Sequence, residues 1–200
     1  MTSPADRILQ QLAFVRELDR LKTVLRRTSL IDRSRRENSA EHTWHLTAMA
    51  LAFAEHAPAG TDLLRVLEML VIHDVVEIDA GDTFAFDAAA NLDKAARETA
   101  AAERLFGLLP HDVGERMRAR WEEFEEGASP ASRFANALDR LQALILNTTP
   151  GDGGTWAMHG VSRTDVLARM APIRDGAPAL WAMVETVVDR AVAVGHVSPD

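Results

Sequence analysis

The sequence contains no cysteine, which excludes disulfide bonds, thiolate metal sites and a cysteine nucleophile. It also lacks any apolar run that approaches the roughly 18 residues needed to cross a bilayer, and its first residues show no signal-peptide core. We therefore expect a cytoplasmic protein without membrane partners. The net charge of −8 argues against nucleic acid as a partner, because the surface as a whole would repel the phosphate backbone.

Strand-type alternation of apolar and polar residues is sustained nowhere in the sequence, and no internal repeat or low-complexity tract is present. A length of 200 residues with 47% hydrophobic and 26% charged residues is typical of one soluble globular domain. In place of strand-type alternation, apolar residues recur every three to four positions, as they do on one face of a helix. The sequence therefore predicts an all-α fold in a single domain over residues 1–200.

An apolar stripe predicts an opening helix that ends near residues 27–28; it consists of Ile8, Leu12, Val15, Leu18, Leu21 and Leu25. The polar segment 29–39 reads as a loop. Asp62 and Ser129 are of the residue types that cap helix N-termini, and Pro130 suits a first helical position. Further helices are expected over residues 40–55, from 63 through 74, and over 92–108, 113–126, 130–147, 163–174 and 178–193.

The chain is organised around residues 69–83, where an apolar run ends in His73 and Asp74. Imidazole nitrogens and carboxylate oxygens are the usual ligands of borderline and hard divalent metals, and burying them without a metal or partner costs free energy. A hydrogen-bonded histidine–aspartate pair that caps a helix is the alternative interpretation. The rest of the chain decides between the two.

Two further residues of the same types lie beside apolar positions on other predicted helices. His42 is near the start of the second helix, and Asp139 lies within an apolar stretch of the helix that follows Ser129. Taken singly, His42 could bond to backbone, and Asp139 could pair with Arg140 or Arg133. Their placement on three helices favours one shared divalent cation, whose ligands would be His42, His73, Asp74 and Asp139.

These residues, in this order, resemble the HD-domain superfamily of metal-dependent phosphohydrolases. The blocks that resemble its small hydrolases related to 5′-deoxynucleotidases are residues 36–45 (RENSAEHTWH), 72–82 (IHDVVEIDAGD), 121–125 (WEEFE) and 138–142 (LDRLQ). The resemblance implies an HD-domain helical bundle, a divalent cation held by the four residues above, and hydrolysis of a phosphomonoester. The metal-site core is then expected over about residues 25–147, with helices of residues 160–195 packing on it.

Two residues of the central stretch are expected to act in catalysis. Asp74 would do so as a metal ligand, and Glu77 as general acid or base, or by orienting the attacking water. Glu77 lies about one helical turn beyond the histidine–aspartate pair, so that it can reach the same site. The resemblance also implies a possible second cation held by Glu77, Asp82 and Thr83, although Asp82 could instead be a turn residue after Gly81.

Seven basic residues crowd the first helix and the segment after it in this otherwise acidic protein; they are Arg20, Lys22, Arg26, Arg27, Arg33, Arg35 and Arg36. A solvated basic face is one interpretation. In the other, one or two arginines bind the substrate phosphate through bidentate hydrogen bonds. By position against the family pattern these are Arg27 first and Arg36 second. Thr28 stands where some nucleotidases of the family carry a tryptophan against the sugar, which weakens the expectation of a deoxyribose preference.

The sequence therefore predicts a metal-dependent phosphomonoesterase that removes the 5′-phosphate from (deoxy)nucleoside monophosphates. The alternatives are an HD hydrolase of another phosphorylated small metabolite and a metal-binding protein without turnover. An oxygenase with two irons is disfavoured, because it requires two histidines between Asp74 and Asp139 and only His111 lies there. The native cation is left open among manganese, cobalt, magnesium, iron, nickel and zinc.

A homodimer or higher homo-oligomer is expected, partly from the resemblance. The last predicted helix also carries apolar residues on more than one face, which indicates a surface for another copy of the chain. These residues are Trp181, Val184, Val187, Val188 and Val192.

Overall fold

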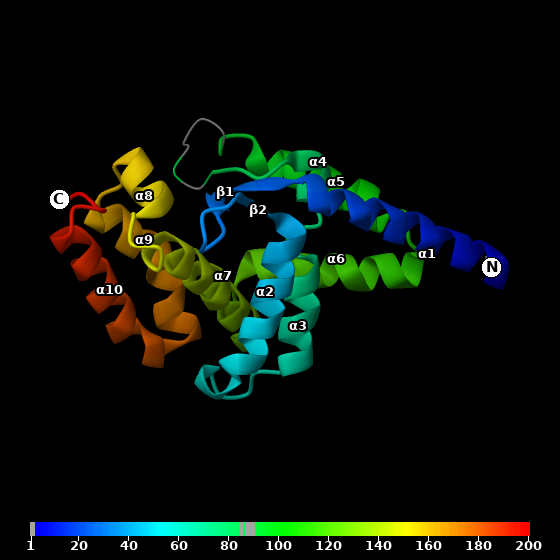
Figure 1. Cartoon of the computed structure of the whole chain (residues 1–200). Coiled ribbons are helices and arrows are strands. Elements are labelled where there is room, and N and C mark those ends of the chain that lie inside the picture. The colour runs from blue at the N-terminus through cyan, green and yellow to red at the C-terminus, as the bar shows by residue number, and fades with distance from the viewer. Residues whose placement is uncertain (1–2, 85, 87–90) are drawn as a thin grey trace.

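Helices dominate the computed structural model, which describes residues 3–84, 86 and 91–200 (Figure 1). Residues 1–2, 85 and 87–90 of the predicted domain lie outside this part. The long helices are α1 (Pro4–Leu18), α2 (Ser39–Ala52), α3 (Leu63–Ile72), α5 (Lys94–Phe106), α6 (His111–Glu126), α7 (Pro130–Thr148), α9 (Arg163–Gly176) and α10 (Trp181–Ala193). The short segments are α4 (Glu77–Ala80), α8 (Gly154–His159) and the 3₁₀ turns η1 (Asp19–Thr23), η2 (Ala54–His56) and η3 (Pro178–Leu180). The all-α class predicted from the sequence is confirmed.

Side-chain caps explain where several of these helices begin. The carboxylate of Asp62 accepts from the backbone N–H groups of Leu64 and Arg65 at the start of α3. Ser129 caps α7 in a capping box and is followed by Pro130 at the first helical position. Both caps were predicted from residue type, and each satisfies backbone donors that a helix N-terminus leaves free. None of the helices in the described residues combines the length and apolar character needed to span a bilayer.

The segment after α1 differs from the predicted helix and loop. The helix ends at Leu18, η1 follows, and strands β1 (Leu25–Ser29) and β2 (Arg36–Asn38) pair in an antiparallel hairpin. Strands of five and three residues are too short to give a recognisable alternation, which is why the sequence pattern missed them. The hairpin lies beside the start of α2 and packs against α7 and α8 (Figure 1), so the loop expectation for residues 29–39 was wrong where β2 forms.

The opening apolar stripe also lies differently from its prediction. Ile8, Leu12 and Val15 are 56%, 47% and 59% exposed, whereas Phe14 is buried. Phe14 meets Phe106 of α5, with ring centroids 6.4 Å apart. Figure 1 shows α1 running out to one end of the molecule, so most of its apolar face has no partner within the described chain.

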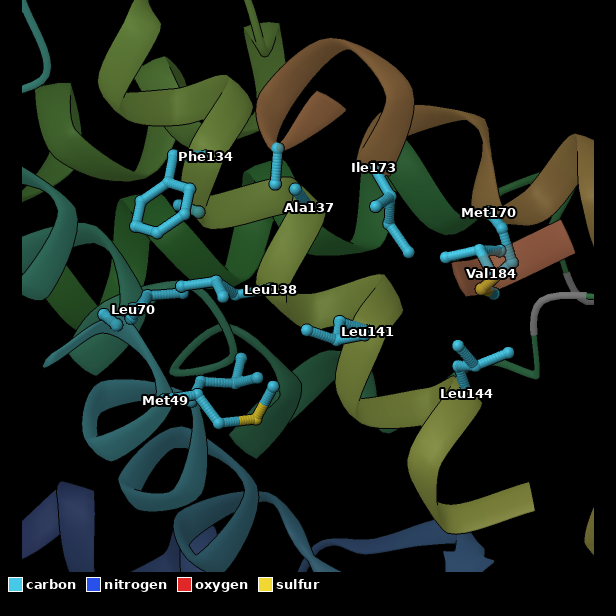
Figure 2. Close-up of a cluster of buried hydrophobic side chains, with 14 of the residues drawn as sticks. Met49, Leu70, Phe134, Ala137, Leu138, Leu141, Leu144, Met170, Ile173 and Val184 are labelled. Atoms are coloured by element: carbon cyan, nitrogen blue, oxygen red, sulfur yellow. The ribbon is translucent and has the colours of Figure 1, made fainter. Parts of the chain in front are cut away.

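Helix α7 forms the centre of the larger hydrophobic core (Figure 2). It packs against α2, α3, α6 and α9. Phe134, Leu138, Leu141 and Leu144 recur along one side of α7 and are almost completely buried. At Gly176 of α9 the two backbones approach so closely that a Cβ atom would lie 2.0 Å from the carbonyl oxygen of Arg133. This close packing fixes the position of α7 and of the polar residues on its other faces.

The apolar surplus of α10 is used within the chain. Val184 and Val188 are buried, and Trp181, Val187 and Val192 pack against the same core. The apolar residues that motivated the prediction of an oligomer are therefore wholly or partly covered by the chain itself. Assembly into a homo-oligomer stays a prediction that rests mainly on the resemblance.

Candidate metal centre and its cavity

Four side chains from three parts of the fold meet at one buried point. His42 comes from α2, His73 and Asp74 follow the last residue of α3, and Asp139 comes from α7. One ligand atom from each of His42, His73 and Asp139 lies within 4.8 Å of the others. Asp74 adjoins them, with Oδ1 3.1 Å from His73 Nε2 and Oδ2 3.7 Å from His42 Nε2. The structure thus brings together all four residues that the sequence singled out.

The imidazole nitrogens that point at this centre face carboxylates, with His42 Nε2 3.1 Å from Asp139 Oδ1. Among the described residues, both ring nitrogens of His42 and Nε2 of His73 are buried and make no hydrogen bond of good geometry, although carboxylate oxygens lie close to them. His73 Nδ1 lies 3.0 Å from the carbonyl oxygen of Leu70, which fixes the ring and leaves Nε2 directed at the centre. Unsatisfied buried nitrogens are costly. Two imidazoles and two carboxylates fit a divalent transition metal.

Burial and the surrounding charges shift the pKa values of these groups strongly. Burial and Arg26 act to lower the pKa of His42, but the carboxylates of Asp139, Glu37 and Asp74 outweigh them and raise it to about 9. Burial lowers the pKa of His73. The pKa of Asp139 stays well below its ordinary value despite burial, because Arg140 and His42 favour its ionised form. The centre is therefore built around ionised carboxylates.

Arg26, one of the seven basic residues noted in the sequence, and Glu37, which the sequence analysis did not single out, form a second layer around the centre. Arg26 Nη1 donates to Asp74 Oδ2 over 2.8 Å, and its Nε lies 3.5 Å from Glu37 Oε2. Glu37 is only 2% exposed and places Oε2 3.6 Å from His42 Nδ1. Gln142 Nε2 donates to Glu37 Oε1 over 2.7 Å. A carboxylate behind a ligating histidine orients the ring and raises its basicity.

Glu77 lies at the start of α4 and lines the same cavity as the metal centre. The hydroxyl of Ser39 donates to Glu77 Oε2 over 2.6 Å. Burial, followed by the negative charge of Asp74, raises the pKa of Glu77 to about 8. A carboxyl group that can gain or lose a proton near neutral pH suits acid–base catalysis.

Asp82 and Thr83, the residues expected to hold a second cation with Glu77, also line this cavity. The backbone N–H of Arg27 hydrogen-bonds the Asp82 carboxylate, although burial dominates and raises the pKa of Asp82. Thr83 Oγ1 accepts from Arg97 Nη2 at 3.3 Å. Glu77, Asp82 and Thr83 thus line one cavity, and binding of a second cation by them stays a prediction.

The cavity encloses about 380 Å³ beside the metal centre. Arg27 lines it and has no side-chain partner in the described part of the chain. Arg36 does not line it; its guanidinium donates to the backbone carbonyls of Leu25 and Arg26 and so supports the hairpin. Of the two arginines suggested for the phosphate, Arg27 alone is placed to reach it.

Aromatic side chains and further cations complete the cavity wall. Phe84 and Phe86 line it and contact each other with ring centroids 5.5 Å apart. Arg140 Nη1 contacts Asp139 Oδ2 over 2.8 Å, the ion pair considered as an alternative for that aspartate. Arg169 of α9 also lines the cavity. No motif in the sequence had pointed to Arg169.

Comparison with known proteins agrees with this geometry. A model of the HD domain family matches residues 18–181. The crystal structure of a predicted metal-dependent phosphohydrolase from Magnetospirillum magnetotacticum MS-1 is 47% identical and aligns over 99% of both chains with a TM-score of 0.93. The 5′-deoxynucleotidase HDDC2 of Danio rerio is 27% identical over 142 residues, 70% of this chain and 68% of that protein. Its Homo sapiens counterpart is 28% identical over 136 residues, 67% and 65% of the two chains. The chain therefore spans about two thirds of these curated relatives.

Proposed function

Because this chain belongs to the HD-domain family of metal-dependent phosphohydrolases, we propose that it removes the 5′-phosphate from (deoxy)nucleoside monophosphates. The observation that carries the proposal is the meeting of two imidazoles and two carboxylates at one buried point, beside a cavity of about 380 Å³ that Glu77 also lines. A cavity of this size accommodates a small molecule. The similarity to 5′-deoxynucleotidases supports the choice of a nucleotide.

A divalent cation would be held by His42, His73, Asp74 and Asp139. When bound, such a cation acidifies water and neutralises charge on phosphoryl oxygens. The donor set suits manganese, cobalt, iron, nickel, zinc or magnesium with graded preference. The orphaned nitrogens of His42 and His73 are the structural support for this assignment.

Glu77 would move the proton in the reaction. Ser39 occupies Glu77 Oε2, which leaves Oε1 to accept a proton from the attacking water or to return one to the leaving alcohol. A pKa of about 8 makes both protonation states accessible near neutral pH. Asp74 would contribute through the metal it holds.

The substrate would be bound by an unpaired cation and an aromatic wall. Arg27 would hold the terminal phosphate, because it lines the cavity without a side-chain partner in the described residues. Phe84 and Phe86 offer faces on which a nucleobase can stack. A terminal phosphate presents three oxygens to share between metal and arginine, whereas an internal phosphodiester has fewer free oxygens.

A panel of phosphoesters assayed with each candidate cation tests the proposal. Phosphate should be released from 5′-nucleoside monophosphates, while cyclic phosphates and internal phosphodiesters should stay intact. Faster release from sugar phosphates that carry no base would favour the hydrolase of another metabolite. Metal uptake without phosphate release from any compound would favour a metal-binding protein without turnover.

A further inference from the structure

Arg169 is a cation on the inner face of a helix, and it has no side-chain partner in the described part of the chain. It lies three residues after Val166 and four before Ile173, both of which are completely buried. Helical spacing therefore turns it inward. There it lines the cavity beside the metal centre. An arginine of this kind is more often paired with a carboxylate.

The neighbouring charges also disfavour the protonated form of Arg169. Burial and the positive charge of Arg140 lower the pKa of Arg169 to about 10, with Asp139 only partly opposing them. Asp139 is already engaged by His42 and by Arg140 Nη1. Within the residues that the structure describes, Arg140 Nε is itself buried without a hydrogen-bond partner. Two guanidinium groups thus approach the cavity with donors left over.

The scissile phosphate does not account for these donors. On the proposed function it would be bound by the metal and by Arg27, which lies on β1, whereas Arg140 and Arg169 come from α7 and α9. An oxyanion bound by Arg140 and Arg169 would satisfy the free donors and remove the repulsion between them. Phosphate and carboxylate groups both match the fork of an arginine.

We propose that Arg169, with Arg140, forms a subsite for a second oxyanion carried by the substrate, a phosphate or a carboxylate distinct from the phosphate that is hydrolysed. This inference rests on the proposed function for the identity of the first phosphate. It makes the preferred substrate a nucleotide with an additional anionic group. The remaining room in the cavity is bounded by aromatic side chains, which suits the base.

Equilibrium binding to a Glu77→Gln protein loaded with its metal tests the subsite without turnover. Orotidine 5′-monophosphate is compared with uridine 5′-monophosphate for a carboxylate, and adenosine 3′,5′-bisphosphate with adenosine 5′-monophosphate for a phosphate. In at least one pair the ligand with the additional oxyanion should bind about 10–100-fold more tightly, the usual gain from charge-assisted hydrogen bonds. Arg169→Met should abolish that advantage, and Arg169→Lys should retain part of it.

Arg163→Met is the matched control, because Arg163 lies on the same helix but pairs with Asp189 at the surface; it should keep the advantage. Equal weakening of all four ligands by Arg169→Met, or no preference within either pair, would overturn the subsite. Phosphate release by the parent enzyme from uridine and adenosine 5′-monophosphates tests the proposed function separately from the oxyanion subsite. If no phosphate is released but the Arg169-dependent preference persists, the proposed function fails and the oxyanion subsite stands.

Discussion

The hydroxyl of Ser39, at the first turn of α2, donates to Glu77 Oε2 across 2.6 Å. Both side chains are buried, and they lie 38 positions apart in the sequence. The bond fixes the carboxyl group of Glu77 relative to α2, the helix that also supplies His42. One helix therefore positions both a metal ligand and the group that we expect to transfer protons.

Replacement of Glu77 by Gln should lower kcat by about 10²–10⁴-fold, the usual size of a lost acid–base group. The cation at the four-residue centre should stay bound, because Glu77 is not among its four ligands. Ser39→Ala should cost much less, since it removes only the orientation of the carboxyl group. Steady-state kinetics and metal analysis check both variants. A Glu77→Gln protein with the parent rate would refute the assignment.

Replacement of Arg27 by Ala should raise KM more than it lowers kcat, because the arginine would bind the phosphate in both ground and transition states. Arg36→Ala is the matched comparison from the neighbouring strand. Since Arg36 donates to the carbonyls of Leu25 and Arg26, its loss should lower the melting temperature more than it changes KM. The reverse pattern, with KM raised chiefly by Arg36→Ala, would identify Arg36 as the phosphate ligand.

Metal uptake should release about one proton per cation at pH 7. The pKa of metal-free His42 is raised from 6.5 to about 9, so its imidazole is protonated at pH 7, whereas ligation requires the neutral ring. Metal affinity should consequently rise with pH until about 9. By the same linkage, the stability that protonated His42 gives the metal-free protein is present below its unfolded pKa and is lost as pH rises through about 9. Calorimetric titration in two buffers of different ionisation enthalpy measures the proton count, and an affinity that does not change from pH 6 to 8 would contradict the expectation.

Glu37→Gln should weaken metal binding by about 10–100-fold, as losses behind a ligating histidine do. The substitution preserves shape but removes the charge 3.6 Å from His42 Nδ1. Glu41→Gln is the control: Glu41 lies four residues on, pairs with Arg35 at the surface and can keep its capping role as glutamine. Competition with a metal-sensitive dye gives both affinities. Equal metal affinities of the two variants would contradict the role of Glu37 in positioning His42.

Most of the long helices could be predicted from the sequence, because they depend on local apolar periodicity and caps. The four proposed ligands could be predicted from their residue types and their order on three helices. Asp62 and Ser129 are residues of the types that begin helices, and an apolar run ends in His73 and Asp74. The hairpin could not be foreseen, since its strands are short and its pairing joins Leu25 to Asn38 across a polar loop. Pairing between residues far apart in the sequence leaves no local pattern from which it could be predicted.

Two residues illustrate what remained hidden. Glu37 sits in a polar, charged segment that looks like a solvated loop, yet it is almost completely buried behind His42. Arg169 does occupy an inner position of the periodic pattern of α9, but a long basic side chain at such a position usually extends to solvent. Only the packing of α9 on α7 shows that it faces a cavity instead.

The most direct test of the account is the hydrolysis of a 5′-deoxynucleoside monophosphate after removal and return of the metal. Dialysis against a chelator should abolish phosphate release, and activity should return in proportion to added divalent cation until the four-residue centre is filled. Asp139→Asn should fail to recover at the same metal concentration. Phosphate release that persists in protein stripped of metal, or a stripped protein that regains metal but never activity with any cation, would contradict the account.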